Sequence, residues 1–299
     1  ATIEATLQKA GAQVYRLPSD PLLRVQLWQV AEAQFFLHLS IHHIIADAQS
    51  LELFLHEWGR CYEALREGTV PILDPPRIQY RDFAHWQAER FASGALSEQK
   101  KYWLAQYADG IPSLDLPYDF SRPLQLRYRG DHVRQPLGTH WIGQLQDLCR
   151  REQTTLFAGL TTLVKAFLGI LTQENDLVLG TPVSGRKHPD LEDQIGLLVN
   201  SVTLRTQRTA EDSLRSFLAK VSHTLFAALE HAEYPFEQLV EALPLVRDLS
   251  RNPLFDVWIQ YLDRSLQGGQ HLQLAGVEVE PLEPTIETTM FDLSFFFVE

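Results

Sequence analysis

The sequence is poor in sulfur, with two cysteines and one methionine in 299 residues. Cys61 and Cys149 lie far apart within helical patterns, without CxxC spacing or neighbouring ligand residues. Neither a disulfide framework nor a metal site is therefore predicted. We expect two buried thiols in a reducing compartment, and so a cytoplasmic protein.

Basic residues are also in deficit. Lysine and arginine number 26 against 38 aspartates and glutamates, which gives a formal net charge of −12. No basic patch with interleaved aromatic residues is present, so nucleic acid is not an expected partner. The longest apolar segment, residues 156–171, contains Lys165 and is too short for a comfortable membrane span. We expect a buried core helix there and no membrane partner.

Several catalytic signatures are missing as well. The chain contains no GxGxxG, GxxxxGK[ST], GxSxG or HExxH motif and no protein-kinase signature set. Dinucleotide, nucleotide and zinc enzymes are thus disfavoured, and we expect the protein to bind no metal or organic cofactor of its own.

The most informative segment that is present is residues 40–50, SIHHIIADAQS. Alternating polar and apolar residues predict a strand over 34–42, and apolar residues at three- and four-residue spacing predict a helix over 51–65. His43 then lies at a strand end, where an imidazole could act as a general base, and Asp47 lies just before the helix. A pair of hydrogen-bonded histidines, with Asp47 as a helix N-cap, explains the same residues.

The rest of the chain alternates irregularly between helical and strand patterns, which predicts an α/β or mixed α+β fold. A proline-rich linker is expected over 111–130. We expect helices over 79–91, 97–107 (capped by Ser97), 141–151, 155–171, 210–232 and 235–243, strands over 132–137, 176–182, 198–205, 255–261, 272–279 and 290–298, and a hairpin turn at Gly268 and Gly269.

Four further motifs follow the histidine pair. They are YRDFAHW at 80–86, IGLLVNS at 195–201, HAEYPFE at 231–237 and RDLSRNPL at 247–254. In this order, with 41–50 as a match to an HHxxxDG motif, they resemble the core motifs of nonribosomal peptide synthetase condensation domains. The last two resemble the subclass that joins two L-residues.

The resemblance implies a two-lobed pseudodimer of chloramphenicol-acetyltransferase-like subdomains with a V-shaped cleft. The N-terminal lobe would cover 1–110, the linker 111–130 and the C-terminal lobe 131–299. Donor and acceptor peptidyl carrier proteins would present thioesters on phosphopantetheine arms, beside an adenylation domain of the same synthetase. The product would be a peptide bond.

The sequence departs from the family pattern in two ways. Ala48 replaces the motif glycine, and if that position had a positive φ a β-carbon would cost about 1 kcal/mol. The chain also begins after the opening motifs of the family and ends before its last strand and helix. We therefore expect both lobes to be incomplete and the first to expose a sheet edge and an apolar face.

The resemblance also implies roles for individual residues. His43 would be catalytic, or would only hold the amine, and His42 would be structural. Asp47 would be a brace, with Arg186 as its candidate partner. Asn252 could contact substrate in the tunnel, although a turn role explains it equally well. Tyr80, Asp82 and Trp86 are expected to pack within a lobe.

Two other functions remain compatible with the sequence. One is a related acyltransferase that uses a free or coenzyme A-bound substrate. The other is a non-catalytic scaffold that binds carrier proteins.

Overall fold

The computed structural model describes residues 3–246, 248–262, 272–282 and 288–298. The chain forms two compact units, each assembled from separate segments. Unit 1 contains Ala1–Trp86, Arg186–Leu198 and Asp263–Thr285, and unit 2 contains Gln87–Gly185, Val199–Leu262 and Ile286–Glu299. These units are not the lobes and linker that the family resemblance implies, which were placed at 1–110, 111–130 and 131–299. That division remains a prediction.

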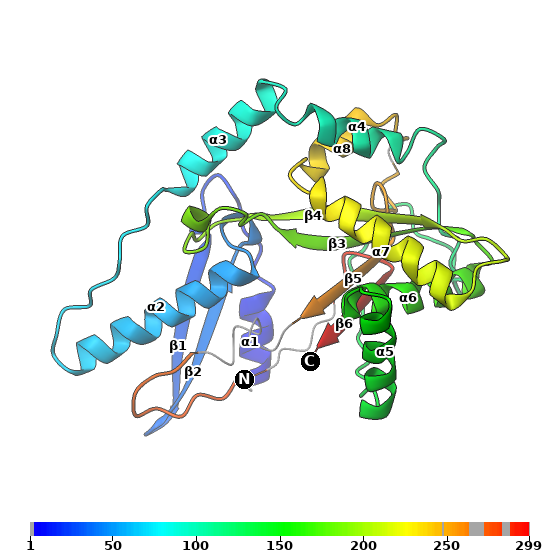
Figure 1. Ribbon diagram of the computed structural model, residues 1–299. Coiled ribbons are helices and arrows are strands. Elements are labelled where there is room, and N and C mark those ends of the chain that lie inside the picture. The colour runs from blue at the N-terminus through cyan, green and yellow to red at the C-terminus, as the bar shows by residue number, and fades with distance from the viewer. Residues whose placement is uncertain (1–2, 247, 263–271, 283–287, 299) are drawn as a thin grey trace. The chain divides into compact units, whose positions relative to one another are not determined.

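Unit 1 is built around a two-stranded antiparallel sheet (Figure 1). Strand β1 (Leu23–Ala31) pairs with β2 (Gln34–Ile41), with Leu23 opposite Ile41 and Leu27 opposite Leu37. Because side chains alternate between faces, most apolar residues of both strands fall on one face, where several of them are exposed, whereas Trp28 and Phe36 lie opposite each other on the other face. The unit also contains helix α1 (Ile3–Gly11), the short 3-10 turns η1 (His43–Ile45) and η2 (Pro189–Leu191), helix α2 (Ala48–Arg66) and the first part of α3 (Tyr80–Ala92).

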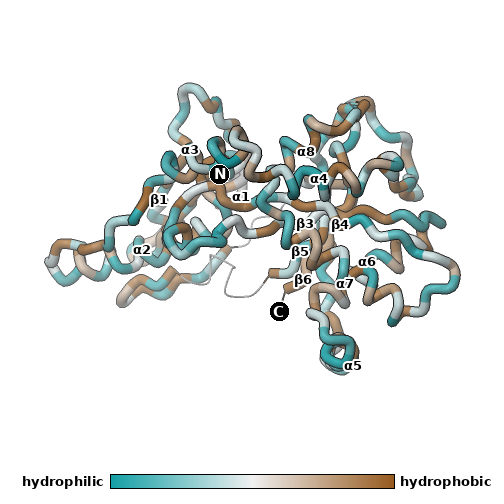
Figure 2. The backbone as a smooth tube through the Cα atoms, turned by 45° about the horizontal axis from the view of Figure 1, so that its top comes forward, coloured by the Kyte–Doolittle hydropathy of each residue, from teal (hydrophilic) through white to brown (hydrophobic). Residues whose placement is uncertain are grey.

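Unit 2 is built around a four-stranded mixed sheet in the order β4-β3-β5-β6. Strands β3 (Asp176–Ser184) and β4 (Val199–Gln207) are antiparallel, and β5 (Val257–Leu262) is parallel both to β3 and to β6 (Leu293–Val298). Its helices are α4 (Ser97–Ala105), α5 (Thr139–Arg151), α6 (Leu156–Thr172), α7 (Leu214–Glu230) and α8 (Phe236–Ala242). Hydrophobic colour follows β5 and β6, whereas α5 is largely hydrophilic (Figure 2).

The core of unit 2 lies between its sheet and helices α6 and α7. Leu168 of α6 and Val221 of α7 pack with Leu179 of β3 and Ile259 of β5, and all four are almost fully buried. This confirms the expectation of a core helix over 156–171. No single helix among the described residues is long and apolar enough to cross a membrane, and one pair bent by 110°, α5 with α6, passes that test by length and composition only.

Most predicted elements are present within a few residues of their expected bounds, but some predictions were wrong. Residues 132–137 form no strand, because the alternation is broken by Pro136 and Val133 is 93% exposed, with no apolar surface to cover it. Over 272–279 there is only an isolated bridge between Leu274 and Val277, since Gly276 with φ of 75° folds the chain into a tight turn. The sequence patterns also missed α1 and β1.

Three smaller expectations need correction as well. Ser97 is the first residue of α4 and not its cap, because Leu96 holds the cap position without a side-chain hydrogen bond. Cys149 is buried as expected, but Cys61 is only half-buried. Ala48 begins α2 and is not among the described residues with a positive φ, so the expected strain is absent there. The expected turn at residues 268–269 lies outside the described residues.

Candidate active site

The two adjacent histidines of unit 1 have different surroundings. The His42 backbone extends the pairing of β2, because its N–H donates to the Leu22 carbonyl at 2.9 Å. Its side chain caps η1, where the Ile44 N–H donates to His42 Nδ1 at 3.1 Å. Its ring and the Tyr15 ring are nearly perpendicular, at 86°, with 5.4 Å between centroids. Since Nδ1 accepts a hydrogen bond, a neutral His42 carries its proton on Nε2.

His43 is the first residue of η1, and its side chain is exposed. Within the described part of the chain, no hydrogen bond engages its imidazole. The turn that carries it is closed by two backbone bonds, from the Ile45 N–H to the His42 carbonyl and from the Ala46 N–H to the His43 carbonyl. The imidazole of His43 is therefore accessible, whereas that of His42 is engaged by the protein.

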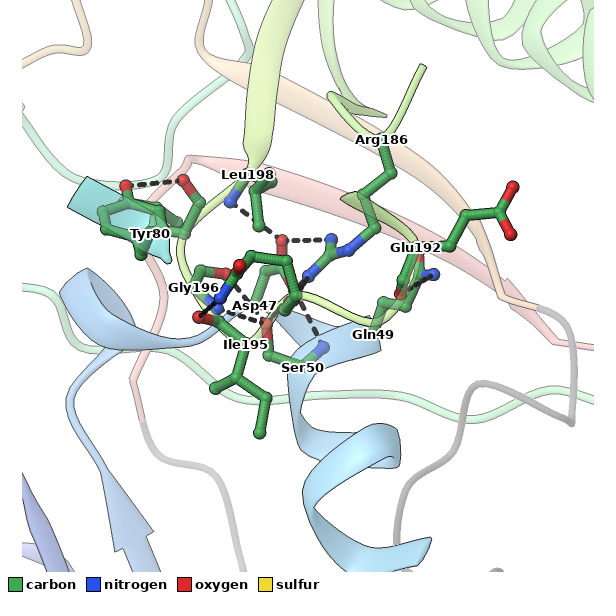
Figure 3. Close-up of polar contacts among 11 residues, drawn as sticks. Asp47, Gln49, Ser50, Tyr80, Arg186, Glu192, Ile195, Gly196 and Leu198 are labelled. Atoms are coloured by element: carbon green, nitrogen blue, oxygen red, sulfur yellow. Dashed lines mark hydrogen bonds and ion pairs between the residues drawn. The ribbon is translucent and has the colours of Figure 1, made fainter. Parts of the chain in front are cut away.

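Asp47 is the N-cap of α2, as one of the sequence interpretations expected, and its side chain is 5% exposed (Figure 3). Oδ1 accepts from the Ser50 N–H at 2.9 Å and lies 2.7 Å from the Ser50 hydroxyl. Oδ2 accepts from the Leu198 N–H at 3.0 Å. The carboxylate thus joins the start of α2 to a segment about 150 residues later.

Arg186, the residue predicted to pair with Asp47, meets the same carboxylate. Its two terminal nitrogens donate to Asp47 Oδ2 at 2.7 Å and to Oδ1 at 2.8 Å, which is a bidentate arrangement. One of these nitrogens also donates to the Gln194 carbonyl at 3.0 Å. The Arg186 side chain is only 3% exposed, so this ion pair is shielded from water.

Opposing effects act on the pKa of Asp47. Burial raises it, but hydrogen bonds from Arg186 and Ser50, together with the positive charge of Arg186, lower it by more. The net result is a pKa below the ordinary value, so Asp47 is ionised at neutral pH. It cannot act as a proton donor there, which fits a bracing role.

The segment from Gln194 to Leu198 is held at successive positions by side chains from other parts of unit 1. Besides the contacts already described, the Tyr80 hydroxyl donates to the Leu197 carbonyl at 3.0 Å. The Tyr80 ring also packs over Gly196, where a Cβ atom would lie 2.1 Å from ring carbon Cδ2. Tyr80 therefore packs against residues that lie outside the predicted lobe 1–110, and the glycine is required by the close approach of this ring.

Asn252 belongs to unit 2, whereas His42 and His43 belong to unit 1. Its side-chain amide donates to the Met290 carbonyl at 2.6 Å. The residue also lines a cavity of about 220 Å³, together with Arg251 and Asp256. This bond joins Asn252 to a backbone group 38 residues later and is not a turn contact, and the substrate role of Asn252 stays a prediction.

Sequence reasoning missed Ser50, which is completely buried beside Asp47. One signal was available in the sequence. Ser50 lies three residues after the helix cap, at a position where Glu or Gln is common. A serine that is buried at such a position needs a hydrogen-bond partner from elsewhere in the fold. Among the residues that the structure describes, no group of three or more His, Cys, Asp or Glu is arranged to hold a metal ion.

Comparisons with known proteins identify the family. The model of the family described as Condensation domain matches residues 1–299. The chain belongs to the condensation domain family. It is 36% identical over 291 residues to gramicidin S synthase 2 of Brevibacillus brevis, covering 96% of this chain and 6% of that relative. This condensation domain thus spans a small fraction of the curated relatives that it matches.

Solved structures show the same fold. The X-domain from teicoplanin biosynthesis is 26% identical with a TM-score of 0.90, covering all of this chain and 68% of that one. The first condensation domain of the CDA synthetase is 19% identical with a TM-score of 0.67, covering 87% and 56%. The mixed α/β class and the fold of condensation domains, predicted from the sequence, are therefore confirmed.

Proposed function

We propose that this condensation domain forms a peptide (amide) bond between a donor acyl or peptidyl thioester and an acceptor aminoacyl thioester. The acceptor amine nitrogen attacks the donor carbonyl carbon, the C–N bond forms, and the C–S bond breaks. The proton lost by the amine ends on the departing thiolate. The observation that carries the proposal is the accessible imidazole of His43 on a turn braced by the buried Asp47–Arg186 pair.

His43 is the catalytic residue of this proposal. As a general base its imidazole takes the amine proton as the C–N bond forms, and as the imidazolium it stabilises charge on the carbonyl oxygen and protonates the thiolate. In the simpler version His43 only accepts a hydrogen bond from the amine and holds it for attack. His42, Asp47 and Arg186 support the turn, because His42 Nδ1, the Asp47 carboxylate and the terminal nitrogens of Arg186 are engaged by the protein.

The partners follow from the same proposal. Donor and acceptor peptidyl carrier proteins supply both thioesters on phosphopantetheine arms, and an adenylation domain of the synthetase loads the acceptor. The domain itself binds no further cofactor, nucleic acid or membrane, and acts in the cytoplasm. The motifs at 231–237 and 247–254 favour L-residues on both sides of the bond. If the domain accepted a D-configured donor in preference to its L-isomer, this part of the proposal would be wrong.

A single-turnover assay with loaded donor and acceptor carriers tests the assignment. In the full-length protein, His43→Ala should lower the rate by about 10²-fold or more, as loss of an acid–base group does. His56→Ala is the matched control, because His56 is also an exposed histidine of unit 1, on α2. If the His43 variant kept nearly the wild-type rate, the catalytic assignment would be wrong.

A protein-binding scaffold without turnover is the second candidate. It is favoured by the likeness to the X-domain, one structure of which is a complex of the X-domain and OxyB with a TM-score of 0.91 to this chain. In that case the wild-type protein would bind partners but form no amide in the same assay. Turnover with coenzyme A thioesters in place of a loaded donor carrier would instead indicate the related acyltransferase.

A further inference from the structure

Ser50 makes more polar contacts than helix formation requires. Its backbone N–H satisfies the cap of α2 by donating to Asp47, and this would be true of any residue at that position. The hydroxyl is additional. It lies 2.7 Å from Asp47 Oδ1 and 2.8 Å from the Gly196 carbonyl, and it accepts from the Gly196 N–H at 3.0 Å and from Arg186 at 2.9 Å.

These contacts use the full capacity of one hydroxyl. A serine has one proton to donate and two lone pairs to accept with. The proton is shared between Asp47 and the Gly196 carbonyl, while both lone pairs are engaged. Since Ser50 is 0% exposed, water cannot replace any of these bonds, and an alanine would leave both backbone groups of Gly196 without this partner.

The same hydroxyl is connected to His43 through a short path. Asp47 lies four residues after His43, and the turn between them is closed by only two backbone bonds, of 3.1 and 3.3 Å. One end of this turn is held at His42, the residue directly after β2, and the other at Asp47. Whatever fixes the Asp47 carboxylate therefore fixes the later end of the turn that carries the imidazole.

We propose that Ser50 is a positioning residue for His43: its hydroxyl locks the Asp47 carboxylate against Arg186 and the Gly196 backbone, and so sets the place of the imidazole. The proposal rests on the proposed function. It predicts that loss of the hydroxyl harms the chemical step more than it harms substrate binding, because His43 moves while the rest of the unit stays folded.

The test is a set of variants in the full-length protein with loaded donor and acceptor carriers. Ser50→Ala should lower the single-turnover rate by about 10- to 100-fold, as a small misplacement of a catalytic group does. The KM for the acceptor carrier should be unchanged. Ser50→Thr, which keeps the hydroxyl, should recover most of the rate. Thr69→Ala is the matched control, because it removes a hydroxyl that binds the Ala64 carbonyl near the other end of α2.

A double-mutant cycle separates positioning from a general loss of structure. In a His43→Ala background, Ser50→Ala should have almost no further effect on the residual rate, whereas a purely structural role would lower it again. A near wild-type rate for Ser50→Ala, or full additivity with His43→Ala, would overturn the proposal. If Ser50→Ala does not fold, Ser50→Cys decides: a folded cysteine variant with the wild-type rate overturns the proposal, and a slow one supports it.

Failure of the proposed function gives a different result from failure of this inference. If the wild-type protein forms no amide, the function itself is wrong and the positioning role falls with it. If the wild type is active and His43→Ala is inactive while Ser50→Ala is fully active, only the role of Ser50 is wrong.

Discussion

Replacement of Asp47 by alanine should destabilise unit 1 far more than replacement of His43. The two residues are four positions apart, but their side chains differ completely in environment. Asp47 is buried and accepts from Arg186, Ser50 and Leu198, whereas His43 is exposed. A comparison of the two alanine variants therefore isolates the brace from the proposed catalytic group.

The size of the effect follows from what the variant leaves behind. In Asp47→Ala the Arg186 guanidinium, 3% exposed, loses its counter-charge, and breaking a buried pair in this way costs about 3–5 kcal/mol. The same substitution also removes the N-cap of α2, and loss of such a cap lowers the free energy of unfolding by about 1 kcal/mol by itself. His43→Ala removes an exposed side chain, so its free energy of unfolding should stay within about 0.5 kcal/mol of the wild type.

Urea unfolding followed by tryptophan fluorescence measures the difference. Asp190→Ala provides a matched control, because Asp190 pairs with Arg77 in the same unit but the Arg77 side chain is 77% exposed. An exposed pair of this kind contributes at most about 1 kcal/mol. The expected order of unfolding midpoints is wild type, His43→Ala and Asp190→Ala close together, and Asp47→Ala well below them.

The pH dependence gives a second check. Because the folded state lowers the pKa of Asp47, the stability that this group contributes is fully present above its unfolded pKa and is lost as the pH falls through the folded pKa. The gap between wild type and Asp47→Ala should therefore shrink in acid, below about pH 4. Equal midpoints for Asp47→Ala and His43→Ala at neutral pH would refute the bracing role.

Two further predictions concern packing and a buried charge. Gly196→Ala should destabilise unit 1, because its Cβ would lie 2.1 Å from the Tyr80 ring, and adding Tyr80→Ala should relieve part of that loss. The melting temperatures of both single variants and of the double variant check this prediction. Strictly additive losses of stability would contradict it. Burial lowers the pKa of Lys165 to about 7, with the charge of Asp176 opposing the shift. Between pH 7 and about 10 the Lys165 amine is therefore protonated in the unfolded chain but neutral in the folded protein, so the free energy of unfolding should rise with pH over this range. Urea midpoints should show this rise for the wild type and not for Lys165→Met.

Local patterns predicted most of the fold because most elements have a clear period. Helices α2 and α6 have apolar residues at helical spacing, and β2 alternates except at Phe36. The errors fall where local pattern and tertiary cover disagree. Residues 132–137 had strand-like composition without a sheet to join, and β1, whose Leu23, Val25 and Leu27 do alternate, was overlooked.

The site could be predicted only in part. His43 and Asp47 belong to one short motif, so a local reading found them together. Arg186 lies 139 residues from Asp47, and only the family resemblance suggested that pair. The contact between Ser50 and Gly196 spans 146 residues and leaves no period or spacing in the sequence, so only the structure brings it to light.

This distribution of roles has a physical reason. A group that must reach a substrate has to remain accessible, and an accessible side chain gains little orientation from its own contacts. In the proposed function His43 is such a group, so its orientation has to come from the backbone on either side of it. The carboxylate of Asp47, with Arg186 and Ser50, supplies that rigidity from a buried position where hydrogen bonds are strong and water is excluded. The proposed reaction therefore depends on buried residues that touch no substrate as much as on the exposed imidazole.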